Sequence, residues 1–133
     1  MLETKAWKCG YEIGDIDENC PVNNENGSDG PECITTHLDV EVLYKEFNLD
    51  PPADGLEAVI SYNAGRYLCE YTYYTSLCRG SSKTLFVHVP LDIYSSEQIA
   101  QGLERILELC LRQVRNEFWT NCLSIKSEEH CYC

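Results

Sequence analysis

Cys69 and His88 are the two residues of this sequence whose types and positions could do nucleophilic chemistry. Cys69 follows a short apolar run, Ala58-Val59-Ile60, and a turn-forming stretch, Asn63-Ala64-Gly65, and it falls where helical spacing of apolar and aromatic residues begins. A helix N-terminus favours a thiolate, which is the nucleophilic form of cysteine. Nineteen residues later, His88 stands near the end of a second apolar run, Phe86-Val87-His88-Val89-Pro90. A cysteine and a histidine at two strand ends are the arrangement that a nucleophile and its base require.

Three elements must position this pair. The pattern predicts a strand over residues 56–61, a helix from residue 66 that carries Cys69, and a strand over residues 85–89. Strand, helix and strand in this order predict a βαβ unit with parallel strands and a right-handed crossover. Cys69 would then lie just past the carboxyl end of a strand, at the edge of an α/β sheet where ligands bind.

Two further helices are predicted around this unit. The first spans residues 37–47, with Asp39 near its start and Asn48 at its end. The second follows Ser95, which has capping-box spacing to Gln98. Its apolar residues recur at intervals of three and four, which favours a face packed on the sheet over a dimer seam: Ile99, Leu103, Ile106, Leu107, Cys110, Leu111 and Val114.

Length and composition indicate one globular domain. The chain has 133 residues, 44% of them hydrophobic, and a net charge of −12 from 22 acidic and 10 basic side chains. This charge argues against nucleic acids and anionic membrane surfaces as partners. No apolar run reaches the roughly 18 residues of a transmembrane helix, and the first residues lack the apolar core of a signal peptide. We therefore expect a cytoplasmic protein whose nine cysteines are free thiols.

Two segments invite a metal hypothesis. Residues 12–31 form an acidic loop rich in Asn, Gly and Pro, but they lack the fixed spacing of a calcium-binding loop. His130, Cys131 and Cys133 near the C-terminus could ligate zinc, although no second ligand pair accompanies them. We divide the chain into a domain over residues 1–116 and an unassigned cysteine-containing tail over residues 117–133.

The segments around the two reactive residues resemble one family. Ser61-x-Asn63-Ala64-Gly65-x-Tyr67-x-Cys69, followed by Phe86-Val87-His88-Val89-Pro90, is similar to pyroglutamyl-peptidase I, the cysteine peptidases that remove an N-terminal pyroglutamate. The resemblance extends from Leu2 to about Val114. It implies an α/β fold, a three-layer αβα sandwich with a mostly parallel sheet. It also implies pyroglutamyl peptides as substrates, a cytoplasmic location, and no metal or organic cofactor.

The resemblance adds a third site residue. Leu2-Glu3, with Gly10-Tyr11 seven residues further on, matches the pair that carries the acidic member of the family's triad. The implied catalytic residues are therefore Cys69, His88 and Glu3, with Glu3 accepting the second ring N–H of the histidine. The backbone N–H of Cys69 is implied as an oxyanion donor.

The sequence also departs from the family pattern. It contains no match to the N-terminal portion that in relatives includes a Gly-Phe-x-Pro-Phe motif and part of the pocket for the pyroglutamyl ring. Asn63 and Glu70 also differ from the residues more usual in relatives. Two functions stay open: a working omega-peptidase, and a non-catalytic or truncated relative that keeps the triad without the substrate pocket. We expect little activity from these residues alone and a tendency to associate, and an oligomer is compatible with the sequence. A cysteine-rich metal-binding protein is the third alternative.

Overall fold

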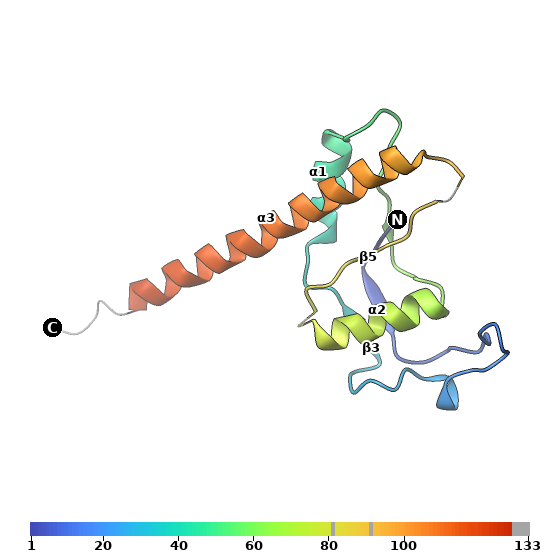
Figure 1. The fold of residues 1–133 in the computed structure, drawn as a ribbon. Helices are drawn as coiled ribbons and strands as arrows, with labels where there is room; N and C mark the ends of the chain where they lie inside the picture. The colour runs from blue at the N-terminus through green and yellow to red at the C-terminus, as the bar shows by residue number, and fades with distance from the viewer. Residues whose placement is uncertain (81, 91, 129–133) are drawn as a thin grey trace.

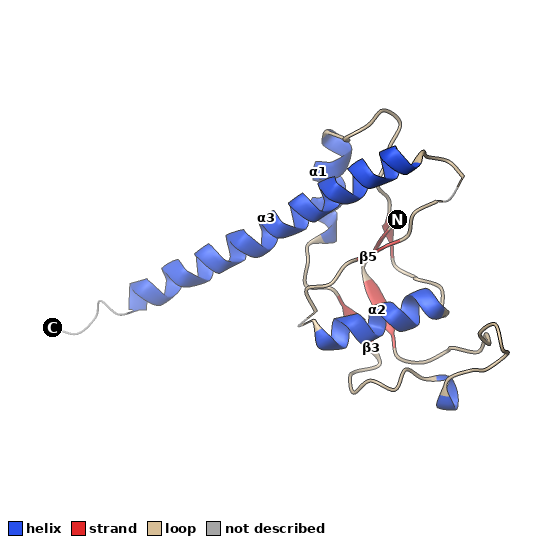
Figure 2. Ribbon diagram, viewed as in Figure 1, coloured by secondary structure: helices blue, strands red, loops and turns tan. Residues whose placement is uncertain are grey.

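The strands form one small mixed sheet and one two-stranded ladder (Figure 2). A computed structural model describes residues 1–80, 82–90 and 92–128, with side chains up to residue 118. The main sheet has the order β4 (Ile60–Ser61), β1 (Leu2–Glu3), β5 (Phe86–Val87), and β1 runs parallel to β4 and antiparallel to β5. The ladder pairs β2 (Lys5–Trp7) with β3 (Cys33–Thr35) in antiparallel register. A 3-10 turn, η1 (Val22–Asn24), lies in the loop between them.

Helices cover the strands on two sides, which gives the predicted αβα sandwich (Figure 1). Helix α2 (Leu68–Arg79) packs on β2, β3 and β5 through a cluster of Ala6, Tyr73, Tyr74, Leu77 and their neighbours Ile34 and Phe86. Helices α1 (Val40–Leu49) and α3 (Ser96–Glu128) cover the other side of β1. The predicted fold class is confirmed, with a mixed sheet in place of a mostly parallel one.

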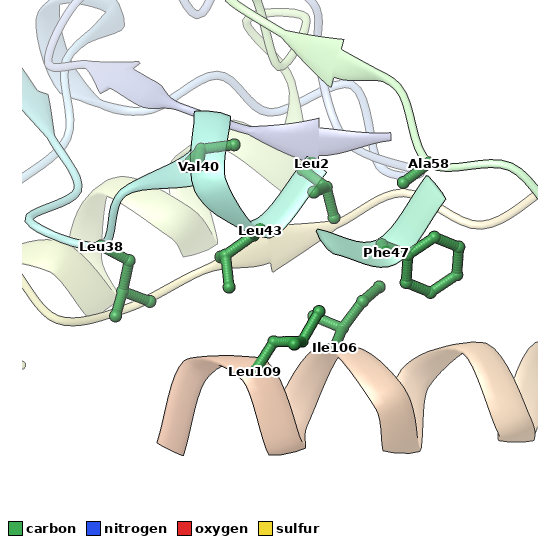
Figure 3. Close-up of a cluster of buried hydrophobic side chains, with 8 residues drawn as sticks. All are labelled: Leu2, Leu38, Val40, Leu43, Phe47, Ala58, Ile106 and Leu109. Carbon is green, nitrogen blue, oxygen red and sulfur yellow. The ribbon is translucent and has the colours of Figure 1, made fainter. Parts of the chain in front are cut away.

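The larger core lies between β1, α1 and α3 (Figure 3). Leu2 points from the sheet toward α1 and α3, because alternate residues of a strand face opposite sides. The buried members of this cluster are Leu2, Leu38, Val40, Leu43, Phe47, Ala58, Ile106 and Leu109. Neighbouring residues Leu2 and Glu3 therefore serve different layers, one in the apolar core and one in the site described below.

The predicted βαβ unit with parallel strands is wrong. β4 and β5 are not neighbours, because β1 lies between them, and they run in opposite directions. The reason lies in where α2 packs. Strand β2 follows β1 after Thr4, beyond the carboxyl end of β1, and α2 packs on β2 and on its partner β3. The chain therefore leaves α2 at that end and enters β5 antiparallel to β1. The strands are also shorter than the predicted ranges of 56–61 and 85–89.

The predicted helix signals are confirmed, with shifted boundaries. Asp39 is the N-cap of α1, and its carboxylate accepts a bond of 3.0 Å from the backbone N–H of Val42. The helix therefore begins at Val40 and not at residue 37. Ser95 and Gln98 form the reciprocal bonds of a capping box at the start of α3, at 2.9 and 3.2 Å.

Helix α3 is longer than the sequence pattern predicts. It continues to Glu128, so the predicted domain boundary after residue 116 falls inside it, and its C-terminal part extends beyond the rest of the molecule (Figure 1). Ile106 faces the core as predicted, and Leu109, which the predicted stripe did not include, is buried there as well. Leu103, Leu107 and Leu111 of the predicted stripe are exposed. Within the described residues, no helix has both the length and the apolarity needed to cross a membrane. The zinc hypothesis at residues 130–133 lies outside the described residues.

Candidate active site

Cys69 lies in the first turn of α2, immediately after the turn that follows β4. The chain turns through Gly65, with φ of 102°, and Arg66, with φ of 51°, before Tyr67 caps the helix. Backbone N–H groups in the first turn of a helix have no acceptor within the helix, so they point toward whatever lies before it. The half-buried Cys69 side chain is therefore at the end of the helix that favours negative charge, as the sequence predicts.

Glu3 and His88 are in direct contact. The Nδ1 atom of His88 lies 2.7 Å from Oε1 of Glu3, and the Glu3 side chain is 1% exposed while that of His88 is 29% exposed. His88 follows β5 directly, and its backbone N–H donates to the carbonyl of Met1 at 2.9 Å. Because Glu3 pairs with Phe86 across the strands, His88 is its diagonal neighbour on the same sheet face. A carboxylate at this position holds the proton of a neutral imidazole on Nδ1 and leaves Nε2 as the basic nitrogen.

The face that carries Glu3 and His88 is the face that α2 covers. Tyr73 of α2 donates from its hydroxyl to the carbonyl of Glu3 at 2.9 Å, and its ring lies 5.7 Å from that of Phe86. The Phe86 ring in turn lies 5.0 Å from the His88 ring. Cys69 precedes Tyr73 by four residues, so it lies one turn earlier on the same side of the helix. In the described part of the chain Cys69 Sγ makes no hydrogen bond, so its contact with His88 stays a prediction.

A second charged pair lies beside Cys69, and sequence reasoning missed it. Glu70 is fully buried, and its carboxylate oxygens lie 2.6 and 2.8 Å from Nη1 of Arg66. In the sequence, Glu70 is distinguished only by its departure from the family pattern. The signal that could have found the pair is the separation of four residues between an arginine and a glutamate across a helix start.

The long acidic loop lies against the start of α2, near the predicted site edge. Buried Asn26 anchors it by donating from its side chain to the carbonyl of Tyr71 and to the hydroxyl of Thr75, both at 2.9 Å. Tyr11 packs edge-on against Tyr71. Between loop and helix is a cavity of about 250 Å³, lined by Tyr11, Ile13, Asp15, Asn19, Cys20, Pro21, Tyr67, Leu68 and Tyr71. A ligand in this cavity would touch the two residues that precede Cys69.

The other described cysteines are free thiols, as expected, but two of them are in less favourable surroundings for a thiolate. Burial raises the pKa of Cys33 in β3, and burial likewise raises the pKa of Cys110 in α3. Among the described residues no three side chains gather that could hold a metal ion.

Comparison with known proteins identifies the family. The pyroglutamyl peptidase family model matches residues 5–114. The chain belongs to the pyroglutamyl peptidase family. It is 38% identical to rat pyroglutamyl-peptidase 1 over 110 residues, which is 76% of this chain and 50% of that protein. The human pyroglutamyl-peptidase 1 is 36% identical over 110 residues, with the same coverage of 76% and 50%. The chain thus spans about half the length of these relatives.

The fold agrees with solved members of the pyroglutamyl peptidase family. The pyrrolidone carboxyl peptidase from Thermococcus litoralis superposes with a TM-score of 0.67 at 23% identity, covering 87% of this chain and 61% of that one. At this identity the likeness concerns the fold. Membership of the pyroglutamyl peptidase family confirms the resemblance drawn from the segments around Cys69 and His88.

Proposed function

We propose that this chain carries the catalytic residues of a cysteine-type omega-peptidase that removes N-terminal pyroglutamate from peptides. The observation that carries the proposal is the bond of 2.7 Å between His88 Nδ1 and Glu3 Oε1, on the sheet face covered by the helix whose first turn carries Cys69. This is the histidine and carboxylate arrangement that activates a nucleophile. The proposed substrate class is that of the rat and human relatives, which are pyroglutamyl-peptidases.

The first step is acyl transfer to sulfur. His88 Nε2 accepts the proton of Cys69, and the thiolate attacks the carbonyl carbon of the pyroglutamyl residue. Glu3 holds the ring by its Nδ1–H and stabilises the imidazolium that forms. The backbone N–H of Cys69, in the open first turn of α2, donates to the developing oxyanion. His88 then protonates the leaving amine, and the peptide departs shortened by one residue.

The second step frees the enzyme. Water attacks the thioester carbonyl while His88 accepts a proton from it, and the tetrahedral intermediate collapses to pyroglutamate and the Cys69 thiol. Both steps use the side chains of Cys69, His88 and Glu3 and the backbone N–H of Cys69. The proposed site of action is the cytoplasm, where thiols stay reduced. The proposed partners are pyroglutamyl peptides, and self-association is compatible with the mechanism.

The test is hydrolysis of a fluorogenic pyroglutamyl amide. The proposal expects turnover that C69A and H88A abolish. C78A is the matched control, because Cys78 is a half-buried cysteine near the other end of the same helix. Turnover that survives C69A would contradict the assignment of the nucleophile.

A second candidate is a relative that keeps the three residues without catalysing the reaction. It is favoured by the lack of a hydrogen bond from Cys69 Sγ within the described residues. Positioning of the reacting carbonyl contributes several kcal/mol to catalysis, about 7–11 in favourable cases, so a site without its full pocket would lose most of its rate. Absence of turnover by a folded chain, combined with an intact bond between Glu3 and His88, would favour this candidate.

A further inference from the structure

Phe86 packs against the ring of His88 without taking part in the proposed chemistry. Phe86 belongs to β5 and His88 follows that strand directly, two residues later, so the two side chains lie on the same face of the sheet. Their ring centres are 5.0 Å apart and the ring planes meet at 60°, which is the edge-on geometry that aromatic pairs prefer. Phe86 is therefore in direct contact with the side chain proposed as the base.

The bond to Glu3 does not by itself fix the orientation of the His88 ring. Only Oε1 of Glu3 reaches the ring, at 2.7 Å from Nδ1, and the buried Oε2 has no hydrogen-bond partner in the described part of the chain. A single bond of this kind sets the distance between two atoms and leaves the ring free to turn about the line that joins them. Because the His88 side chain is 29% exposed, part of the ring borders solvent and has room to turn. A second contact therefore has to decide where Nε2 points.

Phe86 can supply that second contact because helix α2 holds it in place. Its ring centre lies 5.7 Å from that of Tyr73, and it packs against the buried cluster between α2 and β2. Tyr73 is 0% exposed, and its hydroxyl donates to the carbonyl of Glu3 at 2.9 Å. Phe86 in turn pairs with Glu3 across β5 and β1. Tyr73, Phe86 and His88 thus form a continuous aromatic row whose inner end is anchored in the core.

This aromatic row links the base to the helix of the nucleophile. Tyr73 and Cys69 belong to the same rigid element, α2. The row therefore makes the orientation of the His88 ring depend on where α2 lies on the sheet. Such a link matters because an error of about 1 Å in the placement of a reacting group can lower a catalytic rate about a hundredfold.

We propose that Phe86 is a positioning residue, whose ring, held on Tyr73, fixes the orientation of the His88 imidazole and with it the direction of Nε2. The proposal deepens the proposed function and rests on the role given there to His88 as the base. Phe86 acts through His88 and does not touch the reacting atoms. An aliphatic side chain of similar size would fill the space but would offer no flat ring for the imidazole to pack against.

The test measures the mobility of the His88 ring in the full chain, from NMR relaxation of its Cε1–H group. In the unchanged chain the order parameter should lie near the value of about 0.85 that is typical of a rigid group, and in F86L it should fall below about 0.6. F86Y keeps the ring and should keep the value of the unchanged chain. F47L is the matched control, because Phe47 is a buried phenylalanine in the core on the other face of the sheet (Figure 3).

Hydrolysis of the pyroglutamyl amide gives a second measurement. F86L should lower kcat about ten- to a hundredfold, because the base is misplaced. It should change KM by less than about twofold, because Phe86 has no part in binding the substrate. F86Y should restore kcat. An equal loss of ring order in F47L, or a mobile His88 ring in F86L with kcat unchanged, overturns the proposal. If F86L does not fold, as judged by circular dichroism, F86M also removes the ring and decides by the same measurements.

This proposal and the proposed function can fail separately. Absence of turnover by the unchanged chain, with a His88 ring that becomes mobile in F86L and not in F47L, would refute only the proposed function. Turnover that C69A abolishes, with a His88 ring as rigid in F86L as in the unchanged chain, would refute only the role of Phe86.

Discussion

At the scale of single residues, the sequence predicts those parts of the site that depend on neighbouring residues along the chain. Cys69 at a helix start follows from the turn residues before it and the spacing after it, and both are local properties. Glu3 was indicated only through resemblance, because nothing in its own neighbourhood distinguishes it from other acids. Its partner lies 85 residues away, and such a pairing depends on sheet register, which the sequence does not display.

The contact between Glu3 and His88 makes a prediction about the histidine. In the unchanged chain, ¹⁵N NMR of the imidazole should show the neutral ring protonated on Nδ1, because the Glu3 carboxylate accepts that proton at 2.7 Å. E3Q should favour the other tautomer and lower peptidase turnover by about a hundredfold or more, by analogy with a triad whose aspartate is replaced. The exposed His37 is an internal control, since its spectrum should not change. An unchanged His88 spectrum in E3Q would contradict the assigned role.

The surroundings of the cysteines predict which of them reacts first. At mildly acidic pH, iodoacetamide should label Cys69 ahead of Cys33 and Cys110, since burial raises the pKa of those two thiols and leaves less thiolate on each. The exposed Cys9 and Cys20 provide the stricter comparison, because access does not limit them. The measurement is the time course of labelling at each cysteine by mass spectrometry. Equal rates at all positions would refute a specially activated Cys69.

At the scale of elements, the sequence predicts the helix caps correctly but not the direction of strand β5. Asp39 and the pair of Ser95 and Gln98 act within a few residues of themselves, so their roles are visible in sequence. The direction of β5 depends on α2 packing against β2 and β3, which is a tertiary choice. A parallel unit would require α2 to pack on β4 and to return the chain to the amino-terminal end of that strand.

Helix α3 allows a matched test of which side faces the core. L109A should lower the free energy of unfolding by about 2–5 kcal/mol, since Leu109 is 1% exposed and its truncation leaves a cavity against α1 and β1. L107A is the control two residues earlier, where the side chain is 58% exposed, and it should change stability by less than about 0.5 kcal/mol. Urea denaturation followed by circular dichroism measures both. A larger loss for L107A would mean that the exposed leucines are covered in solution.

At the scale of the whole molecule, the tyrosines that bind the layers together are the feature that sequence reasoning did not anticipate. Tyr73 and Tyr74 stand side by side in α2, both fully buried, and each hydroxyl donates to a backbone carbonyl. Tyr74 reaches Pro31 of the loop, and Tyr73 reaches Glu3 of the sheet. The helical spacing of apolar and aromatic residues after Cys69 includes Tyr74 but not Tyr73. It could not show that their hydroxyl groups would satisfy carbonyls 43 and 70 residues away.

These buried hydroxyls predict the response of the molecule to alkaline pH. Burial raises the pKa of Tyr74 to about 12 and raises the pKa of Tyr73 and Tyr11 as well. A raised pKa in the folded state means that folding favours the protonated phenol. This contribution is therefore complete below the unfolded value of about 10 and is lost as the pH rises through the folded value. We expect the free energy of unfolding to fall between about pH 10 and pH 12.

The substitution that isolates this effect is Y74F. It should lower the free energy of unfolding by about 1 kcal/mol at pH 7, because the carbonyl of Pro31 loses its donor. This difference should shrink as the pH approaches 12, because in the parent protein Tyr74 ionises more easily in the unfolded chain than in the folded molecule, which favours unfolding. Y67F is the control, because Tyr67 is 37% exposed at the start of the same helix and should leave the slope with pH unchanged. The measurement is urea denaturation in reducing buffer at several pH values from 7 to about 11.5. A cost that stays constant across this range would show that Tyr74 ionises as easily in the folded molecule as in the unfolded chain.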